Sequence, residues 1–173
     1  MNILVTGKNG QLGFELQRAL APLGQVIAVD REDCDLADAD AIRSLVRSVQ
    51  PDLIVNPAAY SAVDRAESEP QLATALNALA PAVLGEEATR IGAGVIHYST
   101  DYVFDGTSPR PYVETDATNP LNVYGRTKRD GDLALQQTCP QHIIFRTSWV
   151  VGAHGSNFAK TMLRLAKERD SLS

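Results

Sequence analysis

The chain has 173 residues, 44% of them hydrophobic and 21% charged, which is ordinary for a globular protein with one buried core. Its net charge of −5, without any basic run, disfavours a general affinity for nucleic acid or anionic membranes. The first residues do not resemble a signal peptide, and no apolar run is long enough for a membrane helix. Cys34 and Cys139 form no CxxC motif, so we expect no zinc site and a reducing, cytoplasmic location.

The spacing of apolar residues predicts alternating strands and helices. Short apolar runs predict strands at residues 3–5, 26–29, 53–55, 95–98 and 143–145. Helical spacing predicts helices at residues 11–20, 38–49, 70–91, about 124–137, and from 157 to about 169, with a loop over 105–120. Pro81 lies inside the third helical pattern, and it predicts a kink or break there.

This alternation predicts an α/β fold. Strands that are apolar throughout belong to parallel sheets covered on both faces, so we expect a Rossmann-like doubly wound parallel sheet with helices on both faces. Residues 1–173 are interpreted as one NAD(P)-binding Rossmann domain. No smaller substrate domain follows in this chain, which suggests a fragment of a longer protein. Such a fragment is expected to bind NAD(P)H but to turn over poorly, because water is not excluded from the open sheet edge.

A glycine-rich loop follows the first predicted strand and opens the first helix. Gly7 permits a tight turn, Gly10 permits close approach of a pyrophosphate, and Gly13 permits the helix to pack closely on the strand. The helix N-terminus would supply N–H donors for the phosphates. The strand–loop–helix context favours a dinucleotide site over a turn without a ligand.

Asp30 ends the second predicted strand, 17 residues after Gly13. A carboxylate there can accept hydrogen bonds from the adenine ribose, which favours NAD. Arg31 follows directly and could pair with a 2′-phosphate, which favours NADP. An ordinary exposed Asp-Arg pair is the alternative interpretation. We expect both cofactors, NADPH and NADH, to be used.

Tyr124 and Lys128 are four residues apart in a predicted helix. Side chains at this spacing share one face, with Cβ atoms about 6 Å apart, so the lysine charge could lower the pKa of the phenol and make it a usable proton donor. Together with the glycine loop, this pair predicts carbonyl reduction by a nicotinamide cofactor. Thr100, at the end of the fourth strand, could hold the substrate carbonyl beside Tyr124, or it could only satisfy the backbone.

Other residues fall on the same predicted sheet edge. Trp149 could stack on a sugar or base, or it could belong to the core. Asp101 and Tyr102 could contact hydroxyl groups or order their loop. His97 lies within a strand pattern and is interpreted as a packed residue.

Several segments resemble the dTDP-4-dehydrorhamnose reductases of the extended short-chain dehydrogenase/reductase superfamily. These segments are Gly7–Gly13, Asn56–Glu67 (NPAAYSAVDRAE), His97–Gly106 (HYSTDYVFDG), Asn119–Lys128 (NPLNVYGRTK), Phe145–Trp149 (FRTSW) and Asn157–Leu165 (NFAKTMLRL). The resemblance implies NAD(P)H-dependent reduction of the 4-keto group of dTDP-4-dehydro-L-rhamnose, which supplies dTDP-L-rhamnose for bacterial surface polysaccharide.

The resemblance also implies roles for individual residues. The implied catalytic residues are Thr100, Tyr124 and Lys128. The implied cofactor contacts are Gly10, Gln11, Leu12, Asp30, Asp35, Leu36, Ala59, Tyr60, Ser61 and Tyr98. They add to Gly7 and Gly13 of the glycine loop and to Lys128, which could bond the nicotinamide ribose as well as polarise Tyr124. The implied sugar-nucleotide contacts are Thr100, Asp101 and Trp149. Pro57 and Ser61 are mild departures from the family pattern. Some family members dimerise through magnesium held by glutamates, and Glu15 is a candidate for such a ligand in a homodimer.

Two other classes of function stay open. A sugar-nucleotide dehydratase or epimerase shares the superfamily, but dehydratases typically carry an acidic residue directly after Thr-Asp, where this chain has Tyr102. A non-catalytic regulatory subunit would bind a partner enzyme and would not need Thr100, Tyr124 and Lys128.

Overall fold

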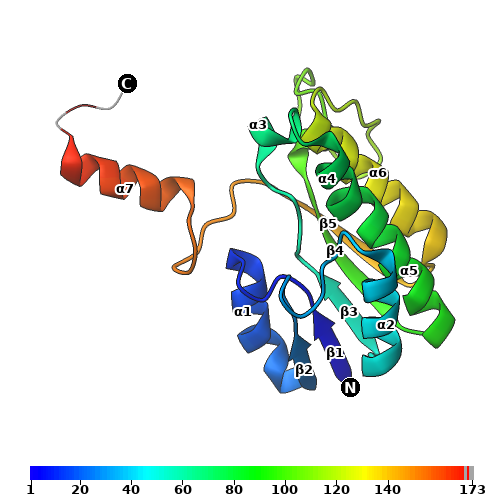
Figure 1. Ribbon diagram of the computed structural model, residues 1–173. Coiled ribbons are helices and arrows are strands. Elements are labelled where there is room, and N and C mark those ends of the chain that lie inside the picture. The colour runs from blue at the N-terminus through cyan, green and yellow to red at the C-terminus, as the bar shows by residue number, and fades with distance from the viewer. Residues whose placement is uncertain (170, 172–173) are drawn as a thin grey trace.

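The computed structural model describes residues 1–169 and 171. Its centre is a five-stranded parallel sheet in the order β2-β1-β3-β4-β5 (Figure 1). The strands are β1 (Asn2–Val5), β2 (Gln25–Ala28), β3 (Leu53–Asn56), β4 (Gly94–Thr100) and β5 (His142–Thr147). All five predicted strands are present, and the Rossmann-like fold class is confirmed.

Helices cover both faces of the sheet. The helices are α1 (Gln11–Leu20), α2 (Ala39–Val49), α3 (Val63–Ala66), α4 (Pro70–Thr74), α5 (Ala80–Ile91), α6 (Val123–Thr138) and α7 (Phe158–Glu168). The larger core cluster joins the sheet to α2, α5 and α6 through residues such as Ile42, Leu84 and Leu135. A smaller cluster on the opposite face joins the sheet to α1 through Leu16 and Leu20. Apolar residues on both faces explain why the strand sequences are almost continuously hydrophobic.

The strand order changes direction beside β1. The chain moves from β1 to β2 on one side and then returns to β3 on the other, so β1 and β3 meet at the topological switch point. In sheets of this kind, ligands bind beyond the carboxyl ends of the strands at such a point. The glycine loop follows β1, and Thr100 is the last residue of β4. The predicted site residues therefore gather at one edge of the sheet.

The predicted helix at 70–91 is interrupted, as Pro81 led us to expect. Residues Ala75–Leu79 form a π-helical turn between α4 and α5, in which the Ala80 N–H bonds to the Ala75 carbonyl. Proline lacks an N–H, and its ring crowds the carbonyl four residues earlier, which here belongs to Asn77. The wider turn accommodates both effects. Helix α3 was not predicted, because one turn is too short to show a period.

Two glycines let α6 pack very closely against its neighbours. A Cβ atom on Gly125 would overlap the carbonyl of Tyr102, and one on Gly131 would overlap the carbonyl of Asn77. The N-cap of α6 is Asn122, whose side chain accepts a 2.7 Å hydrogen bond from the Gly125 N–H. These contacts fix the position and rotation of the helix that carries Tyr124 and Lys128.

Helix α7 stands apart from the sheet in Figure 1. It follows a long segment after β5, and its Phe158 and Leu163 are exposed. Over residues 1–169, none of the helices has the length and hydropathy needed to cross a membrane.

Candidate functional site

The glycine loop has the conformation expected of a tight turn between β1 and α1. Gly7 has a φ of +61°, and its carbonyl accepts a 3.0 Å hydrogen bond from the Gly10 N–H. A Cβ on Gly13 would overlap the Gly7 carbonyl, so glycine there permits close packing of α1. Gln11 and Leu12 form the first turn of α1, and no described side chain caps this helix at Gly10. The first-turn N–H groups therefore face the sheet edge without a side-chain partner.

Asp30 fastens the glycine loop to the end of β2. One carboxylate oxygen accepts a 2.9 Å hydrogen bond from the Asn9 N–H, and the other accepts a 2.8 Å bond from the Arg31 N–H. The bond from Asn9 joins the glycine loop to the residue that follows β2, whereas the bond from the neighbouring Arg31 only orients the carboxylate.

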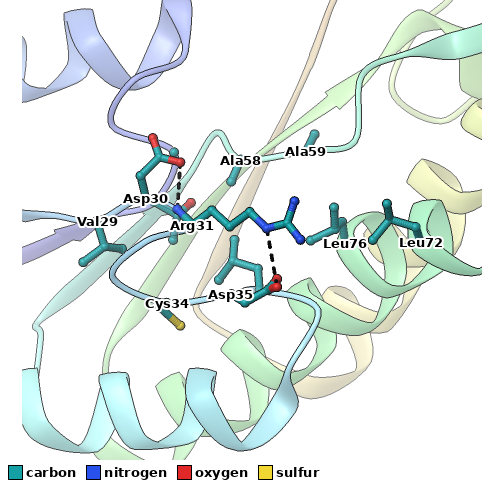
Figure 2. A pocket seen from close by; sticks show the side chains of 12 residues that line it. Val29, Asp30, Arg31, Cys34, Asp35, Ala58, Ala59, Leu72 and Leu76 are labelled. Atoms are coloured by element: carbon teal, nitrogen blue, oxygen red, sulfur yellow. Dashed lines mark hydrogen bonds and ion pairs between the residues drawn. The ribbon is translucent and has the colours of Figure 1, made fainter. Parts of the chain in front are cut away.

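A cavity of about 180 Å³ lies beside this loop (Figure 2). Five of the predicted cofactor contacts line it, namely Gly7, Asp30, Asp35, Leu36 and Ala59. Arg31 reaches along the cavity, with its Nε 3.5 Å from a carboxylate oxygen of Asp35 (Figure 2). Sequence reasoning missed the apolar lining residues Val29, Cys34, Ala58, Leu72 and Leu76. Leu72 and Leu76 arrive through the docking of α4 and the π-helical turn, which no local pattern reveals.

Eight predicted cofactor contacts do not line this cavity, namely Gly10, Gln11, Leu12, Gly13, Tyr60, Ser61, Tyr98 and Lys128. The Tyr60 hydroxyl donates a 2.6 Å hydrogen bond to Glu69, and its backbone N–H and carbonyl both bond to the Asn77 side chain, at 2.8 and 3.0 Å. Ser61 is exposed in the adjoining loop. Tyr98 lies half-buried on β4, where its ring contacts Phe145. The buried Asn77 thus holds the loop after β3 and was missed by the sequence analysis.

Tyr124 lies in the first turn of α6 and is half-buried. Its ring and that of Tyr102 meet edge to face, with centroids 5.6 Å apart. Burial raises the pKa of the Tyr124 phenol, and the nearby Thr100 hydroxyl partly opposes this shift. The prediction that Lys128 lowers the pKa of the phenol is therefore wrong for this structure, in which that pKa is raised.

The reason lies in where the Lys128 ammonium points. Its Nζ is 2.7 Å from the Tyr98 carbonyl oxygen and 3.1 Å from His97 Nε2, and the side chain is almost completely buried. Burial lowers the pKa of Lys128 to about 8, while the charge of Asp132 opposes the change. The lysine is thus held on the inner side of α6, with hydrogen-bond partners of its own.

Thr100 and Asp101 form a hydrogen-bonded pair at the end of β4. The Thr100 hydroxyl donates to Asp101 Oδ1 at 3.0 Å and accepts from the Tyr102 N–H at 3.2 Å. Ser148, after β5, donates a 2.6 Å hydrogen bond to the other Asp101 oxygen. Asp101 therefore joins the ends of two neighbouring strands.

Trp149 is not a core residue. Its side chain is 74% exposed, its φ is +51°, and its ring meets Phe158 edge to face at 5.1 Å between centroids. The same segment then passes over the start of α1. Asn157 donates a 2.9 Å hydrogen bond to the Gln11 side chain, and the His154 ring stacks on Phe14 at 3.9 Å. The segment after β5 therefore covers part of the glycine-loop region.

Glu15, the candidate magnesium ligand, lies on α1. Its carboxylate pairs with Arg18 at 2.8 Å. Within the described part of the chain, no group of three or more His, Cys, Asp or Glu side chains is arranged to hold a metal ion. Nothing in this arrangement supports a magnesium site at Glu15.

The parallel sheet, the glycine loop at its switch point and the tyrosine–lysine helix define a Rossmann-like α/β protein. The chain belongs to the family described as the RmlD substrate binding domain, whose model matches residues 1–173.

Individual relatives agree with this assignment. A dTDP-4-dehydrorhamnose reductase of Salmonella typhimurium is 58% identical over all of this chain, which spans 59% of the length of that relative. A crystal structure of a dTDP-4-dehydrorhamnose reductase from Clostridium acetobutylicum superimposes with a TM-score of 0.96 at 40% identity, covering 99% of this chain and 61% of the other. A crystal structure of a dTDP-4-dehydrorhamnose reductase from Bacillus anthracis in complex with NADP superimposes with a TM-score of 0.93 at 37% identity. The match covers 97% of this chain and 60% of the other.

Proposed function

We propose that this chain carries the cofactor-binding and proton-donating parts of an NAD(P)H-dependent reductase that converts the 4-keto group of dTDP-4-dehydro-L-rhamnose to a hydroxyl group. The observation that carries the proposal is the placement of Tyr124, Lys128 and Thr100 on adjoining elements at the ligand edge of the sheet. The named activity of relatives up to 58% identical supports the choice of substrate.

The residues of the chain fit a nicotinamide dinucleotide. The uncapped start of α1 suits a pyrophosphate, because free N–H groups and the helix dipole attract anions. The cavity between Asp30 and Leu76 has apolar walls and a charged rim, which suits an adenosine. When bound, the cofactor supplies the hydride for the reduction. The NADP complex of the Bacillus anthracis relative supports this cofactor class.

The proton chemistry is assigned to the chain's own side chains. Thr100 would hold the substrate carbonyl oxygen through its hydroxyl, and Tyr124 would donate its phenolic proton to that oxygen. A raised phenol pKa keeps Tyr124 protonated at neutral pH. Lys128 would supply positive charge behind the phenol once a ligand is present. Asp101 and Trp149 are proposed contacts for the sugar nucleotide.

Arg31 is proposed to favour the 2′-phosphate of NADPH, while Asp30 favours the ribose hydroxyls of NADH. We expect the affinities for NADPH and NADH to differ by less than about a hundredfold. In Arg31→Ala, NADPH affinity should fall about tenfold or more, with little change for NADH. Fluorescence titration of both cofactors measures this. Arg164→Ala, which removes an exposed arginine on α7, is the control. An equal loss for both cofactors would contradict this role of Arg31.

The turnover rate should fall as the pH rises through about 8, the value to which burial lowers the pKa of Lys128. Deprotonation removes the ammonium charge that favours proton donation by Tyr124. The phenol itself has a raised pKa, so it should lose its proton at higher pH than the lysine. A profile of kcat against pH, at saturating substrate and cofactor, measures this. Constant turnover well above pH 8 would argue against a charged Lys128 in the reaction.

Measuring NADPH oxidation by the full-length protein tests the proposed function itself. We expect oxidation that depends on the keto-sugar and yields the reduced sugar. Release of a dehydrated or epimerised sugar would favour the dehydratase or epimerase alternative. Cofactor binding without turnover would favour a regulatory subunit. The cytoplasmic location and the homodimer stay predictions.

A further inference from the structure

A chain of four buried polar side chains runs from Lys128 into the centre of the sheet. Lys128 Nζ is 3.1 Å from His97 Nε2, and His97 Nδ1 is 3.1 Å from the Asn56 side-chain amide. The same amide is 2.6 Å from the Thr6 hydroxyl at the end of β1. Each of the four residues is at most 1% exposed. Asn56 and His97 are paired neighbours in the β3–β4 register.

We propose that His97 is a positioning residue for Lys128, and that its imidazole changes tautomer so that it can hold the lysine as either an ammonium or a neutral amine. A neutral imidazole has one N–H donor and one acceptor nitrogen. His97 is therefore matched to partners that exchange donor and acceptor roles. The consequence of this tautomer change for the reaction rests on the proposed function of Lys128.

The two hydrogen-bonding states of these four side chains follow from counting donors and acceptors. An ammonium can only donate, so His97 Nε2 must then accept and Nδ1 must carry the proton, with the Asn56 amide oxygen facing Nδ1. With a neutral amine, Nε2 can carry the proton and donate to Lys128 Nζ, while the Asn56 amide N–H donates to Nδ1. In that state the Thr6 hydroxyl donates to the Asn56 oxygen. Rotation of the Asn56 amide connects the two states, and in the ammonium state its N–H group faces the Thr6 hydroxyl oxygen, which can accept from it.

The surroundings keep His97 neutral in both states. Burial and the nearby Lys128 charge hold the pKa of the imidazole well below its usual value. Asp132 on α6 faces it, with Oδ1 3.9 Å from His97 Nε2, and burial raises the pKa of that carboxyl group. Ser99 donates a 2.6 Å hydrogen bond to the other Asp132 oxygen, and Arg146 Nε on β5 is 3.8 Å from that oxygen. Ser99 and Arg146 thus engage one oxygen of Asp132, while Oδ1, which faces His97, has no hydrogen-bond partner among the described residues.

Lys128 can therefore titrate near pH 8 without leaving its position. Both protonation states of the lysine keep a hydrogen bond to His97, and the Tyr98 carbonyl accepts a second bond. An apolar residue in place of His97 would remove one partner of the ammonium. The pKa of Lys128 should then fall further, because hydrogen bonding to the charged form favours that form.

NMR of the cofactor-free, full-length protein with ¹⁵N-labelled histidine tests the inference without needing turnover. His97→Gln identifies the His97 signals. We expect a neutral ring with its proton on Nδ1 below pH 8, and on Nε2 above it. The same tautomer on both sides of pH 8, or a charged imidazolium below it, would overturn the inference. If NADPH oxidation fails while the tautomer changes as expected, the proposed function fails and the hydrogen-bond assignment stands.

A pair of variants tests the consequence for catalysis. His97→Leu removes the hydrogen-bond partner, whereas the amide oxygen introduced by His97→Gln can still accept from the ammonium near the Nε2 position. We expect His97→Leu to move the alkaline limb of the kcat profile down by about one pH unit. In His97→Gln the alkaline limb should lie closer to that of the parent protein, with at least half of that shift reversed. If the Leu variant folds and its limb stays in place, His97 is only a packing residue and the inference is wrong.

Discussion

Tyr124→Phe should lower kcat by about 10²–10⁴-fold while leaving the affinity for NADPH nearly unchanged, because the variant loses only the proposed proton donor. The phenyl ring keeps the half-buried packing of Tyr124 against Tyr102, so a loss of activity would not come from misfolding. Steady-state kinetics together with a cofactor titration measure both quantities.

Tyr102→Phe is the matched control for this change. It removes a hydroxyl from the ring that meets Tyr124 edge to face, and it should change kcat by less than about threefold, since a surface substitution has a small effect. A Tyr124→Phe variant that keeps most of its kcat would exclude Tyr124 as the acid. An equally large loss in Tyr102→Phe would instead indicate that the loop as a whole is required.

Gly131→Ala should destabilise the protein, although the same change in an exposed helix usually stabilises it by about 0.5–1 kcal/mol. The added Cβ would overlap the carbonyl of Asn77, a backbone atom that no side-chain rotation can move. Overpacking of this kind costs about 1–3 kcal/mol. Helix α6 would have to move away from the π-helical turn, so kcat should also fall.

Urea denaturation of the variant and the parent measures the free energy of unfolding. Gly94→Ala is the control, because a Cβ there would make only ordinary contacts, at 3.5 Å from the Gln141 oxygen and 3.6 Å from Leu53 Cδ1. We expect the control to change stability by less than about 1 kcal/mol. A Gly131→Ala variant as stable as the parent would show that α6 has more room than the structure indicates.

The fold could be predicted because its signals are local. Apolar runs gave all five strands, and the break near Pro81 followed from the chemistry of proline. Gly7 and Gly13 could be assigned to a tight turn and a close packing contact because few other residues allow these geometries. The single-turn helix α3 is too short for such a signal.

The site could be predicted only in part, because its electrostatics depend on contacts between distant segments. Tyr124 and Lys128 share a helix, which the spacing shows, but the direction of the lysine side chain is set by His97 and Tyr98 on β4. This is why the lowered phenol pKa expected from the sequence differs from the raised one in the structure. Asn77 was missed for the same reason, since its partner Tyr60 lies in another loop.

The central claim is that the Tyr124 phenol and a nicotinamide act on one ketone. The most direct measurement is a crystal structure of the full-length protein with NADP⁺ and the reduced sugar nucleotide. We predict the Tyr124 hydroxyl within about 2.6–3.2 Å of the sugar O4 atom, with the nicotinamide ring against the same carbon. A nicotinamide ring far from Tyr124, with no space for a sugar between them, would contradict the account.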